Sequence, residues 1–223
     1  EEAQVVPRRG WIIVSNRVPV IVMVNPTPAN VVATTDKAVC NNSTVAAVNF
    51  STTNTVGATT YAWTNNKTSI GLAASGTGNI ASFTAVNNGT APDTATIIVT
   101  PTINNLGVSC AGIKDTFLII VNPTANLNTV SNQVLCNGAA VTAVNFGTTN
   151  TGGTVTYAWT NNTTSIGLAA SGNGNIATFN GVNNGTSPIT ATITVTPTFT
   201  NGGVSCTGTS QTFTITVNPT ANI

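Results

Sequence analysis

The sequence predicts an all-β chain of two tandem β-sandwich domains preceded by an apolar strand. The first observation is an internal repeat, because residues 31–121 and 127–217 align without a gap at an offset of 96, with 57 identities over 91 positions. The second is alternation: Ala191, Ile193 and Val195 are separated by single threonines, which is the period of a strand with one buried face. No stretch has a helical period with caps. Repeats of this length are whole domains rather than solenoid units.

The tetrapeptide Val-Asn-Pro-Thr divides the chain, and its three copies begin at Val24, Val121 and Val217. Each copy follows an apolar run, and its proline would end a strand because proline has no N–H for the ladder. The resulting segments are a flexible polar arm (1–10), an apolar strand (11–24), a first repeat (25–121), a second repeat (122–217) and the start of a linker or tail (218–223).

Each repeat has the signals of an Ig-like sandwich. We expect about seven short strands in each, separated by turn-forming clusters such as Asn87-Asn88-Gly89. One strand of each repeat carries Tyr-Ala-Trp, with the tryptophans at Trp63 and Trp159. We expect both tryptophans to be core residues on a central strand, and a role in stacking on sugars is the alternative.

The four cysteines lie at matching positions of the two repeats: Cys40, Cys110, Cys136 and Cys206. The separation of 70 positions within each repeat predicts one disulfide per repeat and an oxidising compartment. Such a bond would tie the ends of each sandwich together rather than its centre. The alternative is free buried cysteines in a cytosolic protein. No Cys-x-x-Cys pair is present, so no zinc site is expected.

Both repeats contain Tyr-Ala-Trp-Thr-Asn-Asn (from Tyr61 and Tyr157) and Ser-Ile-Gly-Leu-Ala-Ala-Ser-Gly (from Ser69 and Ser165), then Thr-Ala-Thr-Ile, and both close on Val-Asn-Pro. This combination resembles PKD-like repeats, which are Ig-like modules of large secreted surface proteins of Bacteroidota-type bacteria. The resemblance covers both repeats almost entirely. It implies a secreted cell-surface protein, often adhesive or filamentous and commonly exported by a type IX route, and it implies no catalytic residues.

The charge content argues against several classes of partner. Only 5% of the residues are charged, there is no histidine and the net charge is +1. Nucleic-acid binding requires clustered Lys and Arg, and attraction to an anionic membrane surface requires the same. The apolar segment 11–24 is too short to span a bilayer as a helix. We therefore expect no nucleic-acid partner and no membrane span.

Internal comparison of the repeats argues against an enzyme. Every charged residue of the first repeat is replaced by a neutral one in the second, which retains only Tyr157, Cys136 and Cys206 as ionisable side chains. General acid–base catalysis needs a titratable group near the working pH, and a Ser or Cys nucleophile needs a base to activate it. Calcium sites need several carboxylates or carbonyls. The sequence therefore predicts no catalytic residues, no metal site and no cofactor.

The outward faces of the last two strands differ between the repeats. Ile98, Leu118 and Ile120 of the first repeat stand where the second repeat has threonines. If these strands are neighbours, the three side chains form an outward apolar patch. Strands that are apolar on both faces are usually covered on both, so we expect something to cover this patch.

The segment 11–24 is also apolar on both faces. Its candidate interface residues are Trp11, Val20, Ile21, Val22, Met23 and Val24. Exposed, such a strand would aggregate. It could add a strand to a neighbouring subunit, be the end of a further repeat, or fold back onto the patch of the first repeat. A signal peptide, with Arg8 and Arg9 as its basic region, is a further alternative.

These observations predict a non-catalytic structural subunit of an extracellular fibre, sheath or surface adhesin, secreted to the cell surface. Its main partner would be copies of itself, joined head to tail through residues 11–24. The alternatives are a module that binds surface glycans, through Trp11 or the segments Thr64–Asn66 and Ser69–Gly76, and spacer repeats from a much longer adhesin.

Overall fold

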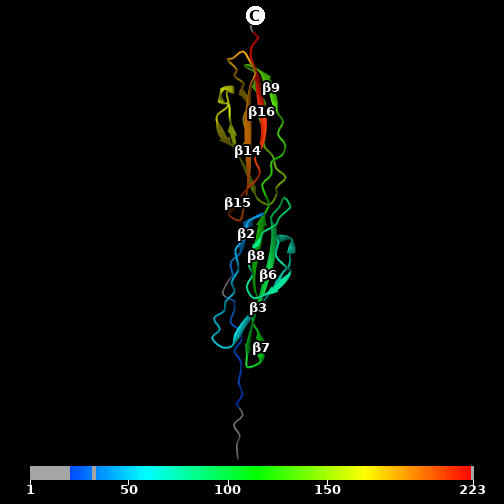
Figure 1. The fold of residues 1–223 in the computed structure, drawn as a ribbon, viewed down its shortest axis with the longest axis vertical. Coiled ribbons are helices and arrows are strands. Elements are labelled where there is room, and N and C mark those ends of the chain that lie inside the picture. Colours follow the sequence, from blue (N-terminus) through cyan, green and yellow to red (C-terminus); the bar gives the residue numbers. More distant parts are fainter. Residues whose placement is uncertain (1–20, 32–33, 222–223) are drawn as a thin grey trace, which may run out of the picture.

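The chain forms two β-sandwiches that lie end to end along the long axis of the molecule (Figure 1). The computed structural model describes residues 21–31 and 34–221. Within these ranges every named element is a strand except for two single-turn 3-10 helices, η1 (Thr68–Ile70) and η2 (Thr164–Ile166). The predicted all-β fold of two sandwich domains is therefore confirmed. The polar arm and the first part of the apolar strand, with Trp11 and Val20, lie outside the described residues.

The first repeat packs a six-stranded sheet against a two-stranded one. The large sheet has the order β1-β8-β6-β3-β4, with β7 also paired to β6, and the small sheet pairs β2 with β5. Only the β1–β8 pair is parallel. The strands are β1 (Lys37–Cys40), β2 (Thr44–Val45), β3 (Ala58–Asn65), β4 (Ser75–Thr77), β5 (Phe83–Thr84), β6 (Asp93–Asn105), β7 (Val108–Ala111) and β8 (Asp115–Asn122).

The second repeat has the same topology. Its large sheet has the order β12-β11-β14-β16-β9, with β15 also paired to β14, and its small sheet pairs β10 with β13. The strands are β9 (Gln133–Cys136), β10 (Ala140–Val141), β11 (Thr154–Asn161), β12 (Ser171–Asn173), β13 (Phe179–Asn180), β14 (Ile189–Asn201), β15 (Val204–Thr207) and β16 (Gln211–Asn218).

Each repeat has its own hydrophobic core, built from the inward face of its large sheet. Buried residues alternate with half-buried or exposed ones along β6 and β14, as the threonine alternation predicts. Trp63 on β3 and Trp159 on β11 are each 7% exposed and belong to the two cores. Gly76 on β4 pairs with Trp63, and a Cβ there would overlap the indole ring, so the glycine makes room for the tryptophan.

The long strands β6 and β14 extend beyond the sandwich that they centre. β6 pairs with β8 from Asp93 to Val99 and then with β7 from Thr102. Pro101 lies where the partner changes, so its missing N–H interrupts neither ladder. The β6–β7 hairpin therefore projects from one end of the first repeat, and the β14–β15 hairpin projects from the same end of the second (Figure 1).

The expectation of one disulfide within each repeat is wrong. The single disulfide joins Cys40 to Cys206, from different repeats, and leaves Cys110 and Cys136 as thiols. Cys40 ends β1 at the register of Asn122, near the start of β6, whereas Cys110 pairs with Ile103 near its end. Ten residues of strand separate these positions by about 30 Å. A disulfide requires Cα atoms within about 7 Å, so the pairing within a repeat is impossible.

Candidate assembly interface

The two repeats meet where the β14–β15 hairpin reaches the end of the first sandwich (Figure 1). Cys206 on β15 bonds to Cys40 at the end of β1, with a Cα–Cα distance of 5.5 Å. Cys206 is 2% exposed. A covalent bond thus closes one side of the joint between the repeats.

Two asparagines fix the same side of the joint. Asn122, the last residue of β8, donates from Nδ2 to the carbonyl oxygen of Asn201 at 3.0 Å. Asn201 donates from its own Nδ2 to Oδ1 of Asn122, also at 3.0 Å. Asn122 is fully buried, so this reciprocal pair satisfies polar groups that have no access to water. The second Val-Asn-Pro-Thr is therefore a structural part of the joint.

The opposite side of the joint is closed by loops. The backbone N–H of Thr151 donates to the carbonyl oxygen of Thr90 at 2.9 Å, across the two repeats. Asn150 donates from Nδ2 to the carbonyl oxygens of Thr90 at 3.3 Å and Thr124 at 3.2 Å. Its Oδ1 accepts from the N–H of Asn126 at 2.7 Å. Because the disulfide and these hydrogen bonds hold both sides, the linker residues 122–126 belong to a defined joint.

The first Val-Asn-Pro-Thr makes the same contacts on the first repeat. Asn25 donates from Nδ2 to the carbonyl oxygen of Asn105 at 3.3 Å, and Asn105 donates from Nδ2 to Oδ1 of Asn25 at 2.8 Å. Asn105 is the counterpart of Asn201 at the offset of 96. Asn25 therefore sits on the first repeat as Asn122 sits on the second. Residues 21–24 then occupy the position that the end of β8 has at the internal joint.

These arm residues are uncovered. The exposed fractions of Ile21, Val22, Met23 and Val24 are 86%, 77%, 64% and 85%, and none of the four belongs to a strand. The described part of the arm thus does not fold back onto the patch of the first repeat.

At the outer end of the first repeat, the β6–β7 hairpin exposes apolar side chains. The equivalent hairpin of the second repeat, β14–β15, lies in the joint between the repeats. Leu106 and Val108, in the β6–β7 hairpin, are 75% and 55% exposed. Their counterparts are Gly202 and the half-buried Val204. Leu106 has a φ of 50°, in the left-handed region that costs an L-residue with a side chain about 1 kcal/mol. The counterpart Gly202 also has a positive φ, which a glycine adopts without this cost.

The outer end of the second repeat presents the other half of such a joint. Cys136, the last residue of β9, is exposed, and it pairs in register with Asn218 as Cys40 pairs with Asn122. Val134 on the same strand is 70% exposed. The two ends of the described chain therefore carry, at corresponding positions, the cysteines whose counterparts are bonded to each other at its centre.

The predicted patch on the first repeat lies on neighbouring strands. β6 and β8 are paired, and Ile98, Leu118 and Ile120 share the outward face of the sheet. Ile98 is 36% exposed, while Leu118 and Ile120 are half-buried. On the second repeat this face carries hydroxyl pairs instead, such as Thr190 Oγ1 and Thr216 Oγ1 at 2.9 Å. What covers the patch in an assembly stays a prediction.

The segments named for glycan binding have structural roles. Asn65 is 6% exposed and donates from Nδ2 to the carbonyl oxygens of Lys67 and Leu72, each at 3.0 Å. Oδ1 of Asn66 accepts from the N–H of Thr96 at 2.7 Å. Trp11 lies outside the described residues. These contacts give Asn65 and Asn66 structural roles that need no ligand.

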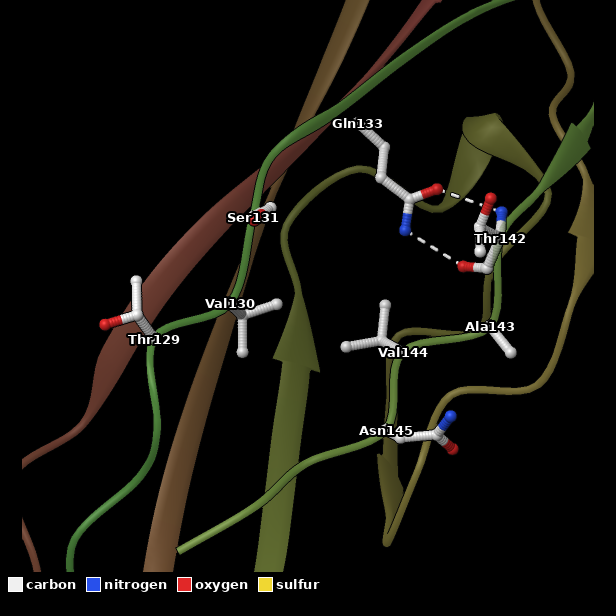
Figure 2. A pocket seen from close by; sticks show the side chains of 8 residues that line it. All are labelled: Thr129, Val130, Ser131, Gln133, Thr142, Ala143, Val144 and Asn145. Atoms are coloured by element: carbon white, nitrogen blue, oxygen red, sulfur yellow. Dashed lines mark hydrogen bonds between the residues drawn. The ribbon is translucent and has the colours of Figure 1, made fainter.

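Shallow hollows occur at matching places on both repeats. One of them has a volume of about 330 Å³. In this hollow Val130 and Val144 face each other from two segments, and Gln133 is hydrogen-bonded to the backbone of Thr142 (Figure 2). The first repeat has a counterpart of about 220 Å³ beside Lys37. A second pair, of about 500 and 460 Å³, lies beside Tyr61 and Tyr157.

The acidic groups of the first repeat act as structural hydrogen-bond partners. Asp93 forms an ion pair with Lys67 and accepts from Oγ of Ser69 at 2.7 Å. Although partial burial acts to raise the pKa of Asp93, the hydrogen bonds from Lys67 and Ser69 and the charge of Lys67 hold it below its ordinary value. In the described residues no group of three or more His, Cys, Asp or Glu side chains could hold a metal ion.

Burial raises the pKa of the Tyr157 phenol, although a hydrogen bond with Thr148 acts in the opposite direction. No helix in the described part of the chain is long and apolar enough to cross a bilayer.

Comparisons with known proteins do not assign the chain to a family. No family model matches the chain, and no curated protein matches it in sequence. Among solved structures it is similar to human Protocadherin-24 EC1-2, with 13% identity and a TM-score of 0.42 over 88% of this chain and all of that one. It is also similar to the chicken CNTN1 FN1-FN3 domains (8% identity, TM-score 0.30, 87% of this chain, 65% of that one) and to the human Desmocollin-1 ectodomain (12%, 0.29, 86% and 41%).

At these low identities and TM-scores, the three similarities carry no argument about function. The resemblance to PKD-like repeats and the bacterial origin stay expectations from the sequence.

The joint contains residues for which the sequence predicted no contact between the repeats, chiefly Asn122, Asn201 and Thr90. The cysteines marked the joint but not its pairing, since their equal spacing favoured bonds within each repeat whereas the structure joins the first cysteine of one repeat to the second cysteine of the next. The asparagine pair had a weaker signal in the identity of Asn105 and Asn201.

Proposed function

We propose that the chain is a non-catalytic structural subunit of an extracellular fibre or surface adhesin, assembled head to tail. In this assembly residues 11–24 of one subunit add a strand to the second repeat of its neighbour. The Cys40–Cys206 disulfide supports an extracellular location, because such bonds persist in oxidising compartments.

One observation carries the proposal: Asn25 is bonded to the first repeat as Asn122 is bonded to the second. At the internal joint, the strand that ends at Asn122 belongs to the preceding sandwich. In the proposed assembly, the segment that ends at Val24 enters the equivalent place in a neighbouring subunit and becomes a strand there. Its exposed side chains supply the apolar surface that such a strand must bury.

In the neighbour this place is held by β16, so the addition is an exchange of strands. By position, Val20 and Val22 take the inward places of Phe213 and Ile215. The strand that enters makes nearly the same interactions as the strand that leaves, so the replacement by itself contributes little to the free energy of assembly. The favourable free energy of assembly then comes from the contacts of the closed joint.

Deletion of residues 1–24 tests the proposal. We expect the intact chain to form filaments under oxidising conditions and the deleted chain to remain a folded monomer, measured by light scattering after size exclusion and by electron microscopy. A chain that lacks only residues 1–10 is the matched control and should assemble as the intact chain does. Filaments of normal width from the 1–24 deletion would reject the exchange of strands.

The second candidate is a glycan-binding module, favoured by the paired hollows beside Tyr61 and Tyr157. Aromatic rings with neighbouring hydroxyls suit the apolar face and the polar edge of a sugar. This function predicts that Tyr61→Ala and Tyr157→Ala together abolish binding to immobilised surface polysaccharide. Deletion of residues 1–24 should leave such binding intact, which separates the two functions.

A further inference from the structure

We propose that Cys136 of one copy and Cys110 of the next form a disulfide equivalent to Cys40–Cys206, so that successive copies of this chain are joined covalently. The inference rests on the head-to-tail assembly proposed above, but it does not depend on which strand fills the joint. It adds a cross-link site that uses the two cysteines left over by the internal bond.

The first argument is the repeat itself. At the offset of 96, Cys40 corresponds to Cys136 and Cys110 corresponds to Cys206. The internal disulfide therefore joins the first cysteine of one repeat to the second cysteine of the following repeat. The two remaining thiols are the same pair of partners, located at the outer ends of the described chain.

The second argument is local geometry, because each thiol is presented as its bonded counterpart is. Cys110 on β7 pairs with Ile103, just as Cys206 on β15 pairs with Phe199. Cys136 ends β9 opposite Asn218 on the neighbouring parallel strand. A second copy placed by the internal joint's geometry would thus bring the two sulfur atoms together.

The third argument is burial. Cys206 is 2% exposed at the internal joint, whereas its counterpart Cys110 is partly exposed. Val204 is half-buried there, whereas its counterpart Val108 is 55% exposed. The uncovered apolar atoms at the outer end are those that a second copy would cover, and this burial would hold the thiols in place.

The two thiols cannot bond to each other within one copy. Cys110 lies in the hairpin at the outer end of the first repeat, and Cys136 lies at the outer end of the second (Figure 1). Each repeat contains a strand of 13 residues, which alone is about 40 Å long. Disulfides require Cα atoms within about 7 Å, so a Cys136–Cys110 bond must join separate copies.

The chemistry is thiol–disulfide exchange with a disulfide oxidant, such as oxidised glutathione. The Cys136 thiolate attacks the oxidant and releases one reduced thiol, forming a mixed disulfide. The thiolate of Cys110 from the next copy then attacks the Cys136 sulfur and releases the second reduced thiol. Two cysteine thiols are oxidised and one oxidant disulfide is reduced, and the two protons pass to the released thiolates.

The test is polymerisation of the full chain in a glutathione redox buffer, followed on non-reducing gels. We expect a ladder of multiples of 22.5 kDa that collapses to monomer on reduction. Cys110→Ser alone and Cys136→Ser alone should each give no ladder. A mixture of these two variants should give one dimer and nothing larger, with a Cys136–Cys110 cross-link identified by mass spectrometry of the digest.

The other outcomes separate this inference from the proposed function. Filaments without a ladder would overturn the disulfide and leave the head-to-tail assembly standing. A ladder from the chain that lacks residues 1–24 would support the disulfide and reject the exchange of strands. Dimers that form as readily in either single variant as in the mixture would show unspecific oxidation and overturn the inference.

Discussion

The internal joint and the two outer ends of the molecule are built from corresponding positions of the two repeats, at which the cysteines are identical whereas Leu106 and Gly202 differ. At the internal joint the disulfide is closed, the two asparagines are paired and Cys206 is almost fully buried. At the outer ends the corresponding thiols are unbonded and Leu106 and Val134 are exposed. In the proposed assembly the repeat is the repeating unit, because positions that are bonded inside the chain are unbonded at each end.

The largest effect is expected from opening the internal disulfide with Cys206→Ser. The bond closes a loop of 166 residues, for which the chain-entropy model gives about 5 kcal/mol of stability against unfolding of both repeats together. Urea unfolding of the oxidised monomer measures the loss. The control, Cys110→Ser, removes an unbonded thiol and should change the free energy of unfolding by less than about 0.5 kcal/mol. Equal losses of unfolding free energy in the two variants would contradict the claim that only the cysteine at the internal joint is bonded.

The asparagine pairs provide a second comparison. Asn122→Ala removes a fully buried side chain and leaves the amide of Asn201 without its partner, which should cost about 2 kcal/mol. Asn25→Ala removes the equivalent pair at the outer end, where water can replace it, and should cost less than about 1 kcal/mol. Both values come from thermal unfolding of the two variants. A cost for Asn25→Ala that equals or exceeds the cost for Asn122→Ala would refute this account.

Leu106→Gly makes the outer hairpin match the inner one, which has Gly202 at that position. Removal of the side chain from a residue with a φ of 50° should stabilise the first repeat by about 1 kcal/mol. The same change removes an apolar contact that we assign to the assembly, so polymerisation should slow while the melting temperature rises. A variant that gains stability and polymerises at the unchanged rate would show that Leu106 has no part in the contact.

The smallest effect is expected when the pH is lowered, because of the two repeats only the first contains acidic side chains. The folded pKa of Asp93 is lowered, so its stabilisation is fully present above the unfolded pKa of about 3.9 and is lost as the pH falls through the folded pKa. The ion pair with Lys67 is near the surface, and its loss should cost less than about 1 kcal/mol. The free energy of unfolding of the first repeat, measured from pH 5 to pH 2, gives this cost. The Asp93→Asn variant should lack the part of the pH dependence that comes from protonation of Asp93.

Much of the fold could be predicted from the sequence because the physical signals were local. Alternation of threonine with Ile and Val marked the strands of both repeats, and Asn-Gly clusters marked the turns. The full length of β6 was less visible, since Pro101 is typical of the end of a strand. Only pairing on both sides of this proline makes the strand long enough to place Cys40 and Cys110 at opposite ends.

The candidate site was less predictable because it depends on how two domains meet. Four cysteines allow three pairings, and equal spacing within the repeats favoured the wrong one. The pairing is decided by the projecting hairpin of β14 and β15, whose reach is a property of the folded sheet. The roles of Asn122 and Asn201 likewise follow from contacts between residues 79 positions apart.

Electron microscopy of the oxidised full chain tests most directly whether the outer ends form the same joint as the centre. If they do, neighbouring repeats are spaced equally along a filament, whether they belong to one copy or to successive copies. Filaments with equally spaced repeats are therefore the expected result. Discrete rods two repeats long, or filaments in which the spacing between copies differs from the spacing within a copy, would contradict the account.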